Sequence, residues 1–261
     1  MKILITGASS GLGAGLAKLY ANPQNELILL ARREDKLFKL RSELFEKCKS
    51  VEVVVADITE FKNLQEKIKK IGAVDMVVLN AGISIGHSLD ITPFDDFKRL
   101  FDVNLFSNHA ILEELLPLFK AQKSGKIVFI SSLASLISMP SSKAYSASKR
   151  ALNAYAESIR YKYMKDGIKV INILPGFIES EMTDKNKFNM PFLLSNEDGV
   201  RKIYNAIQKD KRFYAFPLRF YLIIRTLNLL PQFLRDKIVN SLYWLYKKNN
   251  RILDGKYRNN W

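Results

Sequence analysis

Tyr145 and Lys149 are the residues whose types and spacing first indicate chemistry. They occur in the segment Tyr-Ser-Ala-Ser-Lys, which opens a helix-like stretch that continues to about Lys165. Residues four positions apart lie on one face of a helix, so the ammonium group would stabilise the tyrosinate and lower the pKa of the tyrosine from about 10. Tyr145 could then act as an acid or base near neutral pH. An ordinary tyrosine–lysine pair on a solvated helix face has the same spacing, so the pair alone decides nothing.

A glycine-rich turn near the N-terminus indicates a second kind of site. The strand-like run Lys2–Ile5 leads into Thr6-Gly7-Ala8-Ser9-Ser10-Gly11-Leu12-Gly13 and then into a helix-like segment. Such a turn lets the backbone approach a pyrophosphate and directs helix N–H groups towards it. A tight structural turn would contain similar glycines, but the strand before it and the helix after it are the context of a nucleotide site.

Two serines, Ser131 and Ser132, follow another apolar run, Lys126–Ile130. Ligands bind at the carboxyl ends of the strands in a parallel sheet, so either hydroxyl could donate a hydrogen bond to a carbonyl oxygen. A serine at this position is also a common helix N-cap.

The elements that would position these groups alternate along the chain. Apolar runs separated by helix-like segments are typical of a parallel sheet covered on both faces, and right-handed crossovers make it doubly wound. The runs are Lys2–Ile5, Leu27–Leu30, Val51–Val55, Val74–Leu79, Lys126–Ile130 and Lys169–Leu174. We therefore predict an α/β fold, Rossmann-like, with helices on both faces. Residues 1–211 would form the catalytic and cofactor-binding domain, and residues 212–261 a basic, aromatic helical extension.

Together, six elements in the same order resemble the short-chain dehydrogenase/reductase family in its compact form, over roughly residues 1–210. The elements are Thr6–Gly13 (TGxxxGxG), Asn80-Ala81-Gly82, Asn104, Ser132, Tyr145 with Lys149 (YxxxK), and Pro175-Gly176 with Ile178 and Ser180. Ser132 precedes Tyr145 by the family's spacing, which favours it over Ser131. Ser180 stands where the family more often has threonine.

The resemblance implies a catalytic set of Asn104, Ser132, Tyr145 and Lys149. Tyr145 would protonate a carbonyl oxygen, or deprotonate an alcohol in the reverse direction. Lys149 would hold the ribose hydroxyls of a nicotinamide cofactor and lower the pKa of Tyr145. Ser132 would polarise the substrate oxygen, and Asn104 would support a water that resupplies protons.

The resemblance also implies a cofactor site. Its residues would be Gly7, Ser9, Ser10, Gly11, Leu12, Gly13, Arg32, Arg33, Asp57, Ile58, Asn80, Ala81, Gly82, Tyr145, Lys149, Pro175, Gly176, Ile178 and Ser180. The second strand ends in Arg32 and Arg33 rather than in an acidic residue that would bind the ribose hydroxyls. Two guanidinium groups suit a 2′-phosphate, so we predict NADP(H), with NAD(H) as the less favoured cofactor.

Composition excludes several classes of protein. The 261 residues are 48% hydrophobic, with one cysteine and two histidines. That fits a folded chain without an internal disulfide, made in a reducing compartment, and it does not fit a zinc enzyme. No apolar run reaches the 18 residues of an ordinary membrane span. We expect a cytoplasmic protein without a bound metal.

The C-terminal region is unusually basic. The chain carries a net charge of +15, of which +11 falls in residues 201–261, where 14 basic residues accompany 3 acidic ones. Leu234, Ile238, Leu242 and Leu245 fall on one helical stripe, and Tyr243, Trp244 and Tyr246 precede Lys247 and Lys248. This pattern fits an anionic membrane surface, on the inner face for a cytoplasmic protein. Packing onto the core, or a dimer contact, is the alternative.

These features give two functional hypotheses. The first is an oxidoreductase that moves a hydride between NADP(H) and a carbonyl or alcohol, with Tyr145 as general acid/base. The second is a nucleotide-binding scaffold or regulator at a membrane surface, without turnover. The expected substrate is apolar, because the segments Ile83–Asp90, Leu133–Ser142 and Phe177–Asn196 that would line its pocket are rich in apolar residues. Relatives in the family pair through the helices that carry Asn104 and Tyr145, so we expect a homodimer or larger homo-oligomer, and no nucleic acid partner.

Overall fold

The structure is a computed structural model that describes residues 1–85, 91–184, 186 and 189–257, with side chains described up to Trp244. Among these residues a single parallel sheet has the strand order β3-β2-β1-β4-β5-β6-β7. Its strands are β1 (Lys2–Thr6), β2 (Glu26–Ala31), β3 (Ser50–Val55), β4 (Met76–Leu79), β5 (Gly125–Ile130), β6 (Ile168–Pro175) and β7 (Phe213–Phe216). The order reverses between β1 and β4, which confirms the doubly wound fold predicted from the alternating pattern.

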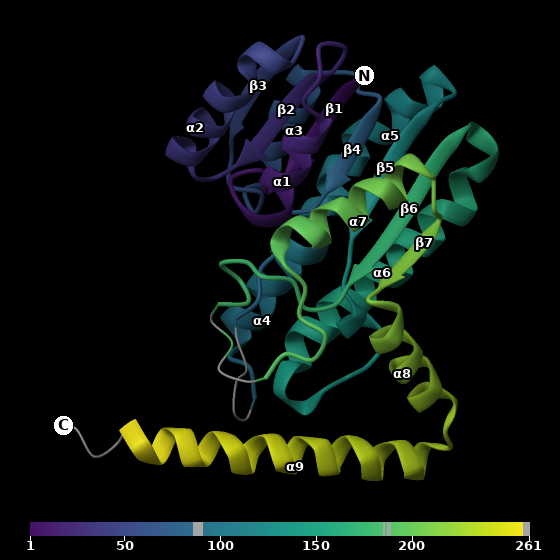
Figure 1. Ribbon diagram of the computed structural model, residues 1–261. Coiled ribbons are helices and arrows are strands. Elements are labelled where there is room, and N and C mark those ends of the chain that lie inside the picture. The colour runs from purple at the N-terminus through teal and green to yellow at the C-terminus, as the bar shows by residue number, and fades with distance from the viewer. Residues whose placement is uncertain (86–90, 185, 187–188, 258–261) are drawn as a thin grey trace.

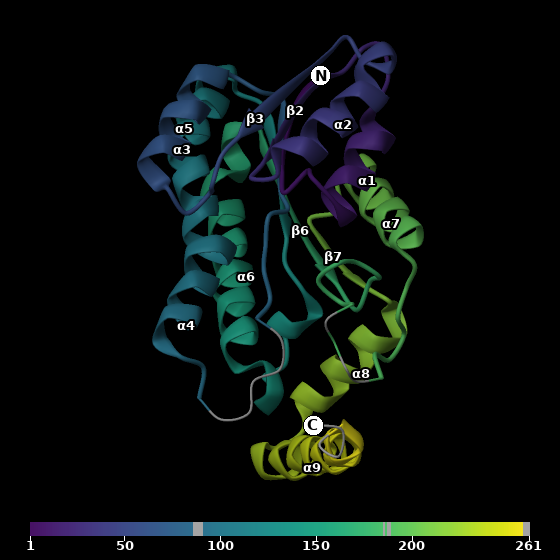
Figure 2. The ribbon, with the colours of Figure 1, turned by 90° about the vertical axis from the view of Figure 1, so that its left-hand side faces the viewer.

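Helices cover both faces of the sheet. The described helices of the chain are α1 (Gly11–Tyr20), α2 (Glu34–Leu44), α3 (Phe61–Ile71), α4 (Phe94–Phe101), α5 (Ser107–Gln122), α6 (Lys143–Tyr163), α7 (Asn196–Gln208), α8 (Leu218–Leu229) and α9 (Gln232–Tyr257). Shorter turns are η1 (Phe45–Lys47), the π-helical η2 (Asp102–Phe106), η3 (Leu133–Ser135), η4 (Pro140–Ser142) and η5 (Met164–Asp166). Helices α1, α2 and α7 lie on one face and α3, α5 and α6 on the other (Figures 1 and 2).

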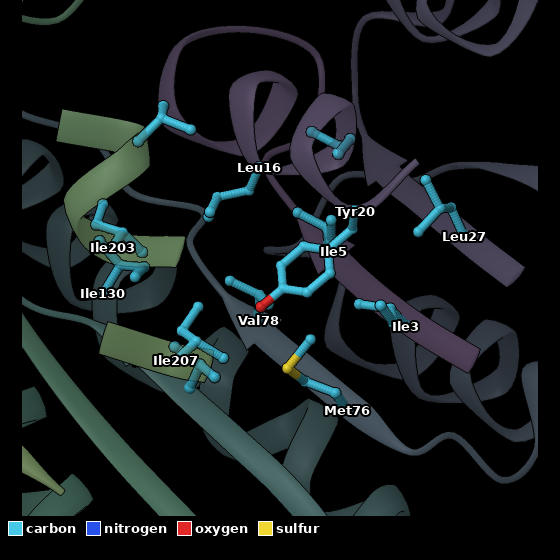
Figure 3. Packing of buried hydrophobic residues seen from close by; sticks show 14 of the residues in the cluster. Ile3, Ile5, Leu16, Tyr20, Leu27, Met76, Val78, Ile130, Ile203 and Ile207 are labelled. Carbon is cyan, nitrogen blue, oxygen red and sulfur yellow. The ribbon is translucent and has the colours of Figure 1, made fainter. Parts of the chain in front are cut away.

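Two hydrophobic clusters hold these layers together. Successive side chains of a strand point to opposite faces, so Ile3 and Ile5 of β1 enter one cluster and Leu4 enters the other. In the first cluster the buried ring of Tyr20 lies against side chains from β1, β4 and α7, including Ile207 (Figure 3). Because both faces of the sheet are covered, the strands are continuous apolar runs rather than alternating ones.

The carboxyl ends of the strands gather at one edge of the sheet. β1 runs in parallel with β2 and β4, with Ile5 opposite Leu29 and Val78. β5 and β6 continue the same direction, with Ile130 opposite Ile173. The loops that follow these strands therefore meet at this edge, which faces α4 and α8 in Figure 1.

The C-terminal region contributes a strand as well as two helices. Residues Phe213–Phe216, predicted from the sequence to belong to the extension, form β7 and pair in parallel with β6. Helix α8 buries Ile224 and Leu227. Helix α9 crosses the end of the molecule at a distance from the sheet (Figure 1). No described helix combines the length and the apolar composition that crossing a membrane needs.

Candidate active site

Tyr145 and Ser132 meet at the carboxyl edge of the sheet. Tyr145 lies in the first turn of α6, and Ser132 follows β5 and caps η3, where its Oγ accepts a hydrogen bond from the Ala134 N–H at 3.1 Å. The Tyr145 and Ser132 side chains are hydrogen-bonded to each other. The neighbouring Ser131 hydroxyl is buried and donates instead to the Lys149 carbonyl at 3.3 Å. Of the two candidate serines, Ser132 is thus the one that contacts the phenol.

Lys149 is a buried cation one helical turn beyond Tyr145. Its side chain is 4% exposed, and Nζ donates to the Ile130 carbonyl at 3.0 Å. Nζ also lies 6.0 Å from the centre of the Tyr145 ring. Burial penalises the ammonium form and lowers the pKa of Lys149 to about 8.

The pKa of Tyr145 is governed by burial. Burial raises it above the ordinary value, and the hydrogen bond with Ser132 lowers it by less. We predict from the helical spacing that Lys149 lowers this pKa; in the structure the lowering contribution comes from Ser132. The sequence shows the spacing of the two side chains but not how deeply the phenol is buried.

Asn104 connects the end of β4 with α6. It is fully buried in the π-helical turn η2, a local geometry that is frequent at functional sites. Its Oδ1 accepts from the Ile83 N–H at 2.9 Å, and its Nδ2 donates to the Ile83 carbonyl at 3.1 Å and to Ser148 Oγ at 3.0 Å. Ser148 in turn donates to the Tyr145 carbonyl at 2.9 Å. Asn104 therefore braces the helix that carries Tyr145 and Lys149.

The glycine-rich turn is shaped for close approach of backbone groups. Gly7 adopts a φ of +66°, and a Cβ on Gly13 would lie 2.3 Å from the Gly7 carbonyl oxygen. Thr6 Oγ1 accepts hydrogen bonds from the N–H groups of Asn80 and Ala81, each at 3.0 Å. The Asn80 amide donates to the Thr6 carbonyl at 2.9 Å. The segment after β4 thereby fixes the conformation of the glycine-rich turn.

The two arginines after β2 have different partners. Arg33 donates to Ser9 Oγ from Nε at 3.2 Å and from Nη2 at 3.0 Å, and Nη2 also donates to Ser10 Oγ. Arg32 forms a longer contact of 3.5 Å with Asp57. Burial raises the pKa of Asp57, but hydrogen bonds from Thr59 and the nearby Arg32 charge bring it below its ordinary value. Only Arg33 is bound to the glycine-rich turn.

The family model described as short chain dehydrogenase matches residues 1–190. The chain belongs to the short-chain dehydrogenase family. An uncharacterized oxidoreductase of Mycobacterium tuberculosis is 37% identical over 225 residues, 83% of this chain and 88% of that protein. Another from Myxococcus xanthus is 34% identical over 243 residues, 92% of this chain and 96% of that protein.

A solved structure has the same fold. The short-chain dehydrogenase from Sphingobium yanoikuyae, in complex with NADPH, superposes with a TM-score of 0.77. It is 21% identical and the match covers 88% of this chain and 96% of that one. The Rossmann-like architecture and the family resemblance predicted from the sequence are therefore confirmed.

In this short-chain dehydrogenase the remaining predicted cofactor residues lie along the same edge. Ile58 is buried after β3, and the Gly176 N–H donates to the Phe216 carbonyl at 2.7 Å. Ile178 is buried and pairs with Leu194 in an isolated bridge. The Ser180 N–H donates to Thr183 Oγ1 at 2.8 Å.

The side of the site next to Tyr145 is lined partly by apolar groups. A small pocket is formed by Ile85, Thr92 and residues 141–145. Phe220 of α8 lies with its ring centre 6.0 Å from that of Phe177 and 5.8 Å from that of Phe192. Residues 86–90 of the first predicted pocket segment and Phe188 of the third lie outside the described residues.

Three polar residues of this edge were not among the candidates from the sequence. Ser148 lies within the Tyr145–Lys149 segment, so its position in the motif could have indicated it. Lys36 and Glu181 form an ion pair at 2.6 Å although 145 residues separate them. No local pattern in the sequence indicates such a pair.

Proposed function

We propose that this short-chain dehydrogenase is an NADP(H)-dependent oxidoreductase that interconverts an apolar carbonyl compound and its alcohol. The observation that carries the proposal is the hydrogen-bonded Tyr145–Ser132 pair beside the buried Lys149 ammonium group. A phenol beside a second hydroxyl gives a carbonyl oxygen two hydrogen-bond donors, and the Lys149 ammonium group lies 6.0 Å from the centre of the phenol ring.

Each residue of the set then has a defined task. Tyr145 Oη donates its proton to the substrate oxygen in reduction and takes it back in oxidation. Ser132 orients that oxygen and lowers the pKa of Tyr145, and Lys149 would hold the ribose hydroxyls. Asn104 keeps α6 and Ile83 in position through its three hydrogen bonds. The bound nicotinamide supplies or accepts the hydride.

The proposed preference for NADP(H) rests on Arg33. Its guanidinium group is already held by the hydroxyls of Ser9 and Ser10 at the glycine-rich turn, where the adenosine end of a dinucleotide would lie. A guanidinium group bound in this way is preorganised for forked hydrogen bonds to a phosphate. The NADPH complex of the Sphingobium yanoikuyae structural relative agrees with this choice.

The packing of α8 beside the site supports the proposal of an apolar substrate. Helix α8 joins Leu133 and Leu174 in a small buried cluster, against which Leu136 and Ile137 of the segment after β5 pack. Asn228 of α8 donates to the Leu136 carbonyl at 2.7 Å. This helix therefore fixes apolar side chains beside the site, and such a lining favours partly apolar carbonyl compounds.

Oxidation of NADPH over a panel of ketones, aldehydes, quinones and acyl thioesters tests the proposal. Turnover with at least one class, lost in a folded Tyr145→Phe variant, is the expected result. NADPH binding without turnover anywhere in the panel would instead favour the nucleotide-binding scaffold. Absence of NADPH binding would refute both.

A second proposal concerns where the enzyme acts. We propose that α8 and α9 dock on an anionic membrane surface, because they expose an unusual number of large apolar side chains. These are Leu218, Leu222, Ile223, Leu229, Phe233, Leu234, Ile238, Leu242 and Trp244. Burying such side chains in the acyl boundary is the usual driving force for interfacial helices.

The positive charge of α8 and α9 also supports docking on an anionic membrane surface. Arg219, Arg225 and Lys237 are exposed on these two helices, and each basic group close to anionic lipid contributes on the order of 1 kcal/mol. The inner face of α8 packs on the core, so packing and docking use different faces of that helix. Leu245 of the predicted stripe, together with Tyr246, Lys247 and Lys248, lies outside the residues with described side chains.

Co-sedimentation with vesicles tests the docking proposal. The protein should bind phosphatidylglycerol vesicles at low salt, release as salt rises, and bind phosphatidylcholine vesicles weakly. If it stays in the supernatant with phosphatidylglycerol vesicles at low salt, the two helices do not dock on anionic lipid.

A further inference from the structure

Glu181 brings a carboxylate to the group of side chains that would bind the 2′-phosphate of the cofactor. Its Oε2 accepts from Arg33 Nη1 at 2.6 Å, and its Oε1 accepts from Lys36 Nζ at 2.6 Å. Ser10 Oγ contacts the same Oε2 at 3.4 Å. Two cations and a serine hydroxyl thus converge on one anion at the end of β2.

We propose that Glu181 determines cofactor specificity by acting as an internal counter-anion that a 2′-phosphate must displace. The inference deepens the proposed function and rests on it. The carboxylate lowers the affinity for NADP(H) without lowering the affinity for NAD(H), which has no 2′-phosphate to compete for the same donors.

The donors of Arg33 show why the two anions compete. Its Nε and Nη2 donate to Ser9 and Ser10, and its Nη1 donates to Glu181. A 2′-phosphate that forms a forked contact with this guanidinium group needs the N–H groups that face Glu181. A carboxylate left beside the phosphate would repel it, so the Glu181 side chain has to move away.

The charge of Glu181 persists under all ordinary conditions. Lys36 and Arg33 lower the pKa of its carboxyl group to about 2, so it remains ionised throughout the neutral range. The Glu181 side chain is 53% exposed, and no other described acidic side chain contacts Arg33 or Lys36. Water can therefore solvate the carboxylate after it is displaced.

The position of Glu181 in the chain links the cofactor site to the substrate side. It follows Ile178 and Ser180 in the segment between β6 and α7, which also carries Phe177 and Phe192. Displacing Glu181 releases the contact that ties this segment to α2. Binding of the 2′-phosphate and the position of the segment predicted from the sequence to line the substrate pocket are thus coupled through one side chain.

Glu181→Gln and Glu181→Ala, compared with Glu179→Gln, provide the test. Glu179 lies two residues earlier in the same segment and is exposed, and its backbone rather than its carboxylate makes the contacts that the structure shows. It is a matched control for the loss of one negative charge. The dissociation constants of NADP⁺, NAD⁺ and 2′-AMP are measured for each variant by calorimetry, with thermal denaturation to check the fold.

We expect both Glu181 variants to bind NADP⁺ and 2′-AMP at least about tenfold more tightly, the scale of one charge-assisted hydrogen bond. Their affinity for NAD⁺ should change less than about twofold, and Glu179→Gln should resemble the wild type. If Glu181→Gln and Glu179→Gln change NADP⁺ affinity equally, the inference is wrong.

A different result would refute the proposed function. A wild-type protein that binds neither NADP⁺ nor 2′-AMP refutes the cofactor assignment itself. In another outcome, the wild type prefers NADP⁺, Arg33→Ala loses that preference, and the Glu181 variants bind like the wild type. This outcome agrees with the proposed function and refutes only the role of Glu181.

Discussion

Replacing Lys149 by methionine separates what this residue does for the reaction from what it does to stability. Its ammonium group is buried and donates a hydrogen bond to the Ile130 carbonyl. Methionine has a similar shape without the charge. The variant should lose turnover, because the cation beside Tyr145 is gone, and yet it should not unfold more readily at neutral pH.

The magnitude follows from the pKa of Lys149, which burial lowers from 10.5 to about 8. A shift of this size means that the charged form destabilises the folded state by about 3 kcal/mol at pH 7. Removing the side chain also leaves the Ile130 carbonyl without this donor, at a cost of about 1–3 kcal/mol. The net expectation is that the free energy of unfolding of Lys149→Met at pH 7 is no lower than that of the wild type and exceeds it by up to about 2 kcal/mol.

The pH dependence of stability tests independently whether the buried Lys149 ammonium group destabilises the folded protein. Between pH 8 and 10.5 the unfolded wild type binds a proton at Lys149 that the folded protein has released, so wild-type stability rises with pH across this window. The variant lacks this group. Relative to Lys149→Met, the wild type should therefore gain about 1 kcal/mol between pH 7 and pH 9.

Urea denaturation at pH 7 and pH 9 measures the difference in the free energy of unfolding between the wild type and Lys149→Met. The other titrating groups are the same in both proteins, so their effects cancel in this difference. Lys162→Met, an exposed lysine of the same helix, is the control and should change stability by no more than about 0.5 kcal/mol. A Lys149→Met variant whose stability relative to wild type does not change with pH would refute the buried-cation reasoning.

Three further predictions concern the site and the docking surface. Tyr145→Phe should lower turnover by at least about 10²–10⁴-fold while NADPH titration shows nearly unchanged affinity, since only the proton-carrying hydroxyl is lost; near-normal turnover would contradict its role as general acid. Arg33→Ala should weaken NADPH binding more than Arg32→Ala does, and neither variant should weaken NADH binding as much. Equal losses of affinity for NADPH and NADH in titrations would place the 2′-phosphate elsewhere. Phe233→Glu should reduce sedimentation with phosphatidylglycerol vesicles, whereas Phe38→Glu, an exposed side chain on α2, should not; identical behaviour of the two variants would count against docking through α9.

The six strands from β1 to β6 could be predicted from the sequence because each is a run of apolar residues between helix-like segments. β7 could not. Its four residues, Phe-Tyr-Ala-Phe, contain no β-branched side chain and lie between basic residues and Pro217. The pairing of β7 with β6 is a tertiary contact. The local sequence does not indicate that the sheet continues beyond residue 212.

The candidate site was predictable where its residues lie in one motif and not where they come from distant segments. Tyr145, Ser148 and Lys149 lie within one turn of α6. Glu181 reaches Arg33 across 148 residues, and an ion pair leaves no periodic signal in either segment. Burial is similarly hidden, since the pKa of Tyr145 depends on neighbours that only the folded chain assembles.

The place of β1 in the sheet has a consequence for synthesis on the ribosome. β1 emerges before the other strands of the sheet but lies between β2 and β4, so one of its edges is unpaired until residues 76–79 have been made. Closing parallel pairs over such separations is slow. Helix α8 needs both β7 and the segment after β5 before it can dock, so the nascent chain completes its sheet before the apolar C-terminal helices can find their contacts.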